Sequence, residues 1–257
     1  MIEIKGVMKE FAKGERRVLA IEDFSLNVAE REFVAILGPS GCGKSTLLNM
    51  VAGFDSPTRG IVRVDGKEIA EPSPQRGVVF QEPALFPWFS VMENVVFGPK
   101  TQGQKAAGYR PRAEQILEQV GLRGFEGSYP AELSGGMRQR VGIARVLIMQ
   151  PQVLLMDEPF GSLDAQTRML MQELLLQVWE QHHQTVLFIT HDIDEAIILA
   201  TRIGIMHAGP ASRLKGVIDV ELNDIERDRT HDRFVAVYRE VHALIRDEVA
   251  IAMQRSQ

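Results

Sequence analysis

The sequence of 257 residues has one cysteine, Cys42, and no long uninterrupted apolar run. A single cysteine excludes a disulfide within the chain and agrees with a reducing compartment. A helix that crosses a membrane needs roughly eighteen consecutive apolar residues, and no stretch of this chain approaches that length. The first residues, MIEIK, show no signal-peptide pattern, so we expect the protein to stay in the cytoplasm.

A basic excess is also absent. The formal net charge is -5, whereas a protein dedicated to nucleic acid normally carries a basic surface. We therefore expect no nucleic-acid partner. The shares of apolar residues, 45%, and of charged residues, 25%, are ordinary for a folded globular protein.

The chain does contain one strong motif, placed between an apolar run at 33–37 and a helical pattern at 45–51. It fits G-x-x-x-x-G-K-[ST] in full, as Gly38-Pro39-Ser40-Gly41-Cys42-Gly43-Lys44-Ser45-Thr46. The glycines allow backbone N–H groups to turn toward an anion, and the helix that follows points its positive dipole end at the same place. Lys44 can reach the β- and γ-phosphates, and the Ser45 hydroxyl can ligate Mg²⁺. The motif predicts a phosphate-binding loop, and a glycine-rich turn that binds nothing is the alternative.

Two kinds of strand pattern predict an α/β fold. Alternation of apolar with polar residues at 2–5, 24–28 and 61–65 is typical of a half-buried antiparallel sheet near the N-terminus. Continuous apolar runs, typical of parallel strands covered on both faces, occupy 78–80, 153–156 and 186–189. Helical patterns occupy 112–122, 136–149 and 166–181. This alternation predicts a phosphate-loop NTPase core with a mainly parallel sheet and its ligand at the carboxyl ends of the strands.

We predict one nucleotide-binding domain over residues 1–257. The stretch from Gln81 to about Leu133 lacks a buried strand pattern, and an inserted helical subdomain is predicted at about 82–150. Packing helices are predicted at about 221–257. There, one helical face carries four apolar residues, Phe234, Tyr238, Val241 and Ile245.

Two carboxylates, Asp157 and Glu158, follow the apolar run at 153–156. In a phosphate-loop fold the carboxyl end of such a strand lies beside the nucleotide, so Asp157 can hold Mg²⁺. Adjacent residues at a strand end face opposite ways, which leaves Glu158 to orient and deprotonate an attacking water. A polar strand end at the surface is the alternative interpretation.

Two further strand ends carry candidate side chains. His191 follows the run at 186–189, where its hydrogen bonding can sense the γ-phosphate. Gln81 follows the run at 78–80, where its amide can orient water or complete the Mg²⁺ shell. The alternatives are a structural role for His191 and an ordinary polar residue at the start of a loop for Gln81.

Ser134, Gly135 and Gly136 stand just ahead of the helical pattern at 136–149 and predict a second helix N-terminus suited to an anion. An ordinary helix cap is the alternative. One nucleotide needs only one phosphate cradle. A second cradle in the same chain therefore suggests that it serves the nucleotide of a partner subunit.

Together these motifs resemble the ATP-binding subunits of ABC transporters. Residues 38–46 are similar to that family's phosphate loop, Gln81 to its Q-loop, and residues 133–136 to its signature motif. The commonest signature has glutamine where this chain has Met137. Residues 153–158 resemble the family's magnesium strand and catalytic glutamate, residues 161–164 its D-loop, and His191 its switch histidine.

The resemblance implies that ATP and Mg²⁺ are the cofactors. It assigns the metal to Ser45, Gln81 and Asp157, and catalysis to Glu158, His191 and Gln81. Phe11 resembles the family's aromatic that stacks on adenine, although Phe11 could instead be a core aromatic of the N-terminal sheet. Asp164 of the D-loop is counted with the nucleotide-binding residues.

The resemblance also implies partners. ATP would be sandwiched in a head-to-tail dimer, between the phosphate loop of one subunit and Ser134, Gly135 and Gly136 of the other. The second subunit is expected to be a copy of this chain. The pair would lie peripherally at the cytoplasmic face of the inner membrane, on transmembrane permease subunits, and would serve a substrate-binding protein indirectly.

Several shorter segments resemble those of ATP-binding subunits in the nitrate, sulfonate and taurine importer group. They lie at residues 84–88, 91–95, 129–133, 137–140 and in the short tail around 233–246. The group's usual loop is matched only loosely at 208–211, which leaves the transported substrate open. Exposed Phe86 and Trp88 would suit contact with a permease, and burial in the helical subdomain is the alternative.

Three other functional classes share the phosphate-loop motif. An exporter subunit is the nearest rival. A soluble ABC-type ATPase acting on DNA or ribosomes would normally insert long coiled coils or fuse two ATPase units, and the sequence has neither. A phosphate-loop kinase or GTPase would need an acceptor site or a guanine-reading Asn-Lys-x-Asp, and no such tetrapeptide is present.

Overall fold

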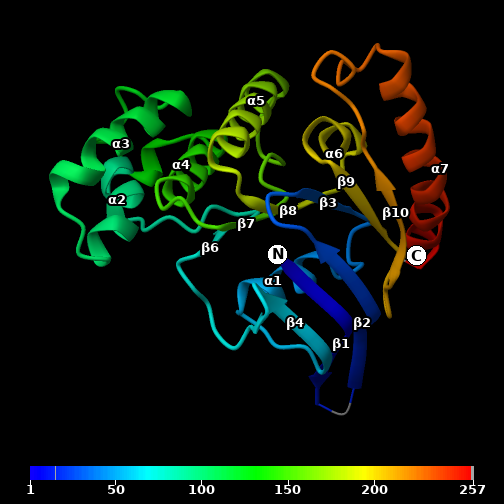
Figure 1. Ribbon diagram of the computed structural model, residues 1–257. Coiled ribbons are helices and arrows are strands. Elements are labelled where there is room, and N and C mark those ends of the chain that lie inside the picture. The colour runs from blue at the N-terminus through cyan, green and yellow to red at the C-terminus, as the bar shows by residue number, and fades with distance from the viewer. Residues whose placement is uncertain (15, 256–257) are drawn as a thin grey trace. The chain divides into compact units, whose positions relative to one another are not determined.

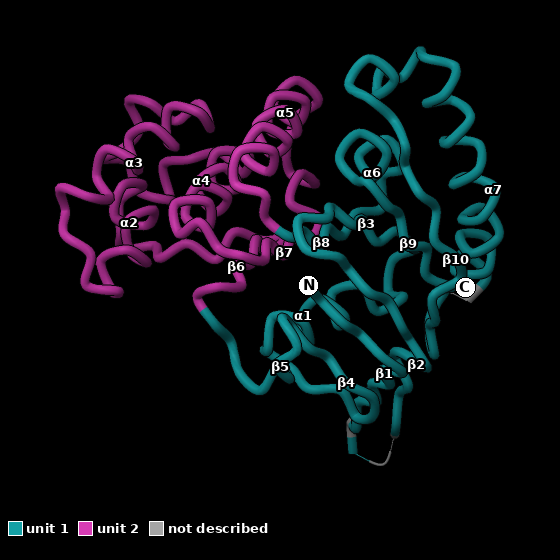
Figure 2. The backbone as a smooth tube through the Cα atoms, in the orientation of Figure 1, with its two compact units in different colours: residues 1–73, 185–257 teal, residues 74–184 magenta. Residues whose placement is uncertain are grey.

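A computed structural model describes residues 1–14 and 16–255 (Figure 1). The chain divides into two compact units (Figure 2), residues 1–73 with 185–257 as unit 1 and residues 74–184 as unit 2. The helical insertion predicted at about 82–150 falls within unit 2, which also holds a strand and a helix beyond residue 150. In the described part of the chain, no helix is both long and apolar enough to cross a membrane.

The N-terminal part of unit 1 is the antiparallel sheet that the alternating patterns predict. Its four strands are β1 (Ile2–Lys13), β2 (Arg16–Val28), β4 (Arg59–Val64) and β5 (Lys67–Glu68), in the order β2-β1-β4-β5. Ile2, Ile4 and Leu26 are buried, as their alternation with polar residues requires. The sheet therefore presents one apolar face to the core.

The turn between β4 and β5 consists of Asp65 and Gly66. Val64 pairs with Lys67, and both turn residues have positive φ, 50° at Asp65 and 74° at Gly66. Asp-Gly suits such a two-residue hairpin because both residues accept the left-handed conformation at low cost. Asp65 also receives a hydrogen bond from the N-terminal amino group of Met1 at 2.7 Å.

A second group of strands in unit 1 is mainly parallel. β3 (Phe33–Leu37) lies between β8 (Thr185–Thr190) and β9 (Arg202–Met206) and runs parallel to both. β10 (Leu214–Asp219) is antiparallel to β9 at the outer side. Every residue of β3 and β8 is buried, as expected for strands covered on both faces.

The described residues of unit 1 form three helices, α1 (Lys44–Ala52), α6 (Ile193–Leu199) and α7 (Asp232–Arg255). α6 packs on β3 and β8, and α7 lies along α6, β9 and β10 (Figure 1). The short α6 was not predicted because seven residues carry too little periodicity. Tertiary contacts stabilise its end, since the Arg227 guanidinium donates to the carbonyl oxygens of Ile197, Ile198 and Ala200.

The C-terminal prediction needs two corrections. In the described part of residues 221–257 there is one helix, α7, because residues 221–231 form turns instead. Phe234, Val241 and Ile245 are buried as predicted, but Tyr238 is 37% exposed and stacks on His242. Tyr238 therefore lies at the edge of the apolar stripe.

Unit 2 contains two parallel strands, β6 (Arg76–Val79) and β7 (Val153–Asp157). Its helices are α2 (Val91–Thr101), α3 (Ala106–Gln119), α4 (Gly135–Leu147) and α5 (Ala165–His182), with a 3₁₀ turn at Pro130–Glu132. The helix predicted at 112–122 begins earlier and continues through Pro111. Loss of the single N–H donor of Pro111 breaks one helical bond without ending the helix.

Asn94 holds the loop that precedes α2. Its side chain is fully buried, its Oδ1 accepts from the Phe86 N–H at 2.9 Å, and its Nδ2 donates to the carbonyl oxygens of Phe86, Phe89 and Ser90 at 3.0 to 3.1 Å. Ser90 and Glu93 complete the start of α2 with a capping box. One buried amide thus contacts four backbone groups of an aromatic loop that has no regular secondary structure, with its two N–H hydrogens shared among three carbonyl oxygens.

We expect Asn94→Ala to lower the free energy of unfolding by about 2–4 kcal/mol, because the Phe86 N–H and the Phe89 carbonyl oxygen lose their Asn94 partner and a buried side chain is removed. Urea unfolding followed by tryptophan fluorescence measures the change. Gln115→Ala, on the exposed side of α3, is the control and should leave the midpoint unchanged. Equal midpoints for the two variants would contradict the structural role of Asn94.

Candidate nucleotide-binding site

The predicted phosphate loop connects the end of β3 with the start of α1. Gly41 and Gly43 have φ values of 76° and 96°, a left-handed conformation that glycine adopts without strain. The Lys44 Nζ donates to the carbonyl oxygens of Gly38 and Pro39 at 2.8 and 3.2 Å, and Lys44 is only 5% exposed. The ammonium group therefore lies within the curve of its own loop.

The same loop offers suitable chemistry for a phosphate group. α1 begins after Gly43, has no acidic residue in its first turn, and has no side chain hydrogen-bonded as a cap. Its first N–H groups and helix dipole thus favour an anion, as does the Lys44 charge. Ser40 and Ser45 are exposed, whereas Cys42 is fully buried and faces the core.

His191 lies at the same edge of the sheet as the phosphate loop. Leu37, the last residue of β3, pairs with Thr190, the last residue of β8. Gly38 and His191 are therefore the first residues beyond two directly paired strand ends. His191 is exposed, and Asp192 just beyond it caps α6 by accepting from the N–H groups of Asp194 and Glu195.

Phe11 lies in β1 opposite Val18 of β2. It is 42% exposed, and the Lys9 Nζ lies 5.0 Å from the centroid of its ring. The alternative interpretation of Phe11 as a core aromatic is wrong. Its ring instead presents an accessible face of the kind that stacks on a base.

Unit 2 brings together a second group of predicted site residues. Val79, the last residue of β6, pairs with Met156 of β7, so Gln81 and the Asp157-Glu158 pair lie at neighbouring strand ends. Gln81 is exposed and both carboxylates are partly buried. The carboxylate and amide oxygens at this edge are of the type that Mg²⁺ prefers.

Glu158 has a backbone conformation that the sequence did not reveal. β7 ends at Asp157, and Glu158 has a φ of 44°, in the left-handed region that side-chain-bearing residues rarely adopt. The alternation of a strand therefore does not set the direction of the Glu158 side chain. Strain of this kind is frequent where a residue must hold a functional orientation.

The signature residues form the start of α4. Ser134 is the N-cap, and its Oγ accepts from the Met137 N–H at 3.2 Å. Ser134 and Gly135 are exposed, so the N–H groups at this helix end face solvent. A Cβ atom on Gly136 would lie 3.3 Å from Leu163, which places the D-loop against the signature turn.

Comparison with known proteins decides the family. Residues 8–161 match the family described as ABC transporter. The chain belongs to that family. It is 45% identical over 240 residues to the aliphatic sulfonates import ATP-binding protein SsuB of Bacillus cereus, which covers 93% of this chain and 94% of SsuB. It is 48% identical over 210 residues to the taurine import ATP-binding protein TauB of Yersinia pestis, which covers 82% and 81% of the two chains.

A solved structure agrees with this assignment. The dimeric post-hydrolysis state of the ATP-binding cassette MJ0796, bound to ADP and Pi, has a TM-score of 0.79 and 32% identity to this chain. The match covers 87% of this chain and 100% of that one. The predicted phosphate-loop NTPase fold with an antiparallel N-terminal sheet is confirmed, and the chain is an ABC ATPase.

Asp164, at the end of the D-loop of this ABC ATPase, caps α5. Its carboxylate accepts from the Thr167 hydroxyl at 2.6 Å and from the N–H groups of Gln166 and Thr167 at 3.1 and 3.0 Å. The hydrogen bonds from Thr167 lower the pKa of Asp164 below its ordinary value. Helix capping accounts for these contacts, and a role for Asp164 at the nucleotide stays a prediction.

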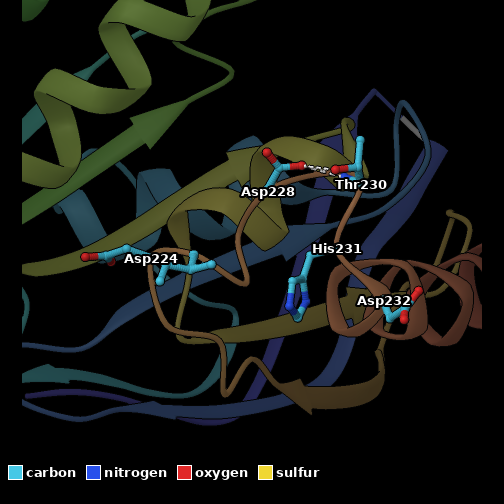
Figure 3. A pocket seen from close by; sticks show the side chains of 6 residues that line it. Asp224, Asp228, Thr230, His231 and Asp232 are labelled. Atoms are coloured by element: carbon cyan, nitrogen blue, oxygen red, sulfur yellow. Dashed lines mark hydrogen bonds between the residues drawn. The ribbon is translucent and has the colours of Figure 1, made fainter.

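A hollow of about 570 Å³ lies over the segment between β10 and α7. It is lined by Asp224, Ile225, Asp228, Thr230, His231 and Asp232 (Figure 3). The Asp228 carboxylate accepts from its neighbour Thr230, and the side chains of Asp224 and Asp232 point in different directions (Figure 3). Because these carboxylates do not converge, we assign no ligand to this hollow.

Lys44→Ala should abolish ATP binding, because it removes both the charge for the phosphates and the donor that holds the carbonyls of Gly38 and Pro39. Titration calorimetry with ATP measures this, and circular dichroism checks that the variant is folded. Lys67→Ala, at an exposed position of β5, should bind as the wild type does. An unchanged affinity in Lys44→Ala would refute the assignment of the phosphate loop.

Proposed function

We propose that this ABC ATPase energises an importer of a small anion such as a sulfonate, taurine or nitrate. The observation that carries the proposal is the placement of the predicted site residues. The loop at 38–46 and His191 follow paired ends of β3 and β8, and Gln81 and Asp157-Glu158 follow paired ends of β6 and β7. The substrate class is supported by the likeness to SsuB and TauB, whose names describe sulfonate and taurine import.

The proposed roles follow from the chemistry of each group. The N–H groups at the start of α1 and the Lys44 ammonium bind the phosphates, while Phe11 stacks on adenine. The Glu158 carboxylate orients the attacking water and accepts its proton. His191 donates a hydrogen bond to the γ-phosphate.

Mg²⁺ is the proposed metal partner of the nucleotide. Ser45, Gln81 and Asp157 offer hydroxyl, amide and carboxylate oxygens, which suit this ion. When bound, Mg²⁺ would neutralise charge on the phosphates.

The proposed active assembly is a head-to-tail homodimer. Ser134 and Gly135 expose a helix N-terminus that does not follow the phosphate-loop strand and can accept the γ-phosphate held by another subunit. The solved dimer of the MJ0796 cassette supports such a pairing. Each subunit would supply half of two sites, so closure requires ATP in both.

The remaining proposed partners are membrane permease subunits and, through them, a substrate-binding protein. Trp88 is 67% exposed, and the half-buried Phe86 contacts Trp88, Phe89 and Phe97 with ring centroids 4.6 to 5.9 Å apart. An exposed aromatic on a packed aromatic base suits a protein contact. This surface supports a peripheral position at the cytoplasmic face of the membrane.

Glu158→Gln should bind ATP with an affinity similar to that of the wild type and hydrolyse it at least about a hundredfold more slowly, because the general base is lost. It should also accumulate as an ATP-bound dimer, since hydrolysis no longer reopens the pair. Single-turnover ATPase assays and size-exclusion chromatography measure the two effects. Glu173→Gln, exposed on α5, is the matched control. Normal turnover in Glu158→Gln would remove Glu158 from this role.

The transport proposal predicts stimulation by substrate. In vesicles that contain the co-purifying permease, with its binding protein added, ATP hydrolysis should rise when taurine, an alkanesulfonate or nitrate is supplied. The reason is that only the loaded binding protein favours closure of the ATPase pair. Stimulation only by a substrate that moves outward would instead support the exporter alternative, and hydrolysis that ignores all three anions would contradict the proposed substrate class.

A further inference from the structure

The segment between β9 and β10, residues 207–213, belongs to unit 1 and has no role in the function proposed above. We call it the β9–β10 loop. Ser212 is fully buried, and its hydroxyl donates to the carbonyl oxygen of His207 at 2.6 Å. The N–H groups of Ala211 and Ser212 donate to the carbonyl oxygens of Leu19 and Ala20 in β2 at 2.6 and 3.1 Å. The loop is therefore a fixed part of the fold.

One side of the β9–β10 loop lies against the phosphate loop. A Cβ atom on Gly209 would lie 2.7 Å from the carbonyl oxygen of Gly41 and 3.2 Å from the Cα of Cys42. No side chain fits between the two backbones at this point. Gly209 therefore packs directly against the backbone of Gly41 and Cys42.

The other side of the β9–β10 loop is bound by Glu248 of α7. The Glu248 carboxylate accepts from the Ala208 N–H at 2.8 Å and from the Lys215 ammonium at 2.7 Å, and it lies 3.1 Å from the His207 Nδ1. Glu248 is 3% exposed. Lys215 is further held by the Leu244 carbonyl oxygen of the same helix at 2.8 Å.

Glu248 is charged in this environment. Burial opposes its ionisation, but hydrogen bonds from Lys215 and Ala208 and the charges of His207 and Lys215 outweigh that effect and lower the pKa of Glu248 below its ordinary value. A buried carboxylate at neutral pH makes charge-assisted hydrogen bonds, which are stronger than neutral ones. Through Glu248, α7 thus contacts His207 and Ala208, the two residues directly before Gly209.

We propose that Glu248 is a positioning residue for ATP binding. By fixing His207 and Ala208 it holds Gly209 against Gly41 and Cys42, and so keeps the phosphate loop in the conformation that receives the phosphates. The inference rests on the proposed phosphate-binding role of residues 38–46. It adds a residue at the far end of the chain that never touches the nucleotide.

This arrangement predicts a specific kinetic effect. If the contact of Gly209 with Gly41 and Cys42 is weakened, a smaller fraction of the free protein has its phosphate loop in the conformation that binds ATP. The apparent affinity for ATP then falls in proportion to that fraction. Bound phosphates order the loop again, so turnover at saturating ATP is retained. The KM for ATP should rise while kcat stays nearly constant.

Two variants weaken the support from opposite sides. Glu248→Gln keeps the shape of the side chain but removes the charge that binds Lys215 and His207. Gly209→Ala places a methyl group against the Gly41 carbonyl and does not alter α7. We expect each to weaken ATP binding and raise the KM about three- to tenfold, with kcat within about twofold of the wild type. Because both act through one loop, the loss in the double variant should be smaller than the product of the two single losses.

Three matched controls separate this role from general destabilisation. Glu240→Gln removes an exposed charge from the same helix. Gly127→Ala adds a methyl group at a loop glycine with open space around it. Phe234→Ala removes a buried side chain of α7, and it should lower the melting temperature with little effect on ATP affinity. All three should retain the KM of the wild type.

Calorimetry with ATP and steady-state ATPase assays on the full chain decide the outcome. A raised KM in Glu248→Gln and Gly209→Ala alone supports the proposal. Wild-type affinity in both variants, or an equal loss in Phe234→Ala, overturns it and leaves the ATPase assignment intact. If the wild-type protein itself fails to bind ATP, the proposed function and this inference fall together. Should Glu248→Gln fail to fold, Gly209→Ala still decides the contact with the phosphate loop.

Discussion

Parallel pairing between buried strands is the constraint on which the rest of this structure depends. Leu37 pairs with Thr190, and Val79 with Met156, so each pair of strands ends at a common edge. The backbone N–H and C=O groups of each strand hydrogen-bond to the neighbouring strands, so polar residues can follow where the strands end. The phosphate loop and His191 are neighbours for this reason, although more than 140 residues separate them in the chain.

Close approach of backbone segments is the second requirement of the site. Gly209 admits no Cβ beside Gly41, and Gly136 lies close to Leu163 of the D-loop. Glycine allows the segments to approach because it has no Cβ atom, and buried hydrogen bonds hold the segments in place. The Lys44 ammonium is likewise held in place by hydrogen bonds to two backbone carbonyl oxygens of its own loop. The geometry around the predicted phosphate loop therefore depends on backbone positions as well as on side chains.

Much of this arrangement could be predicted from local sequence. The phosphate loop, the buried runs of β7 and β8, the Asp65-Gly66 turn and the start of α4 at Ser134 all depend on residues close together in the chain. The short α6, the extent of α3 through Pro111 and the positive φ of Glu158 were not predicted. At α6, hydrogen bonds from the distant Arg227 stabilise a helix end that local periodicity does not indicate.

The sequence by itself determined the class of fold, the family and the motifs, because phosphate binding requires particular residue types at fixed spacing. Only the tertiary structure decided which distant residues support those motifs. Glu248 belongs to no motif, and it acquires its partners His207, Ala208 and Lys215 when α7 packs beside β9 and β10. The reason is physical: a buried carboxylate is stable only where distant donors converge on it, and no local pattern encodes that convergence.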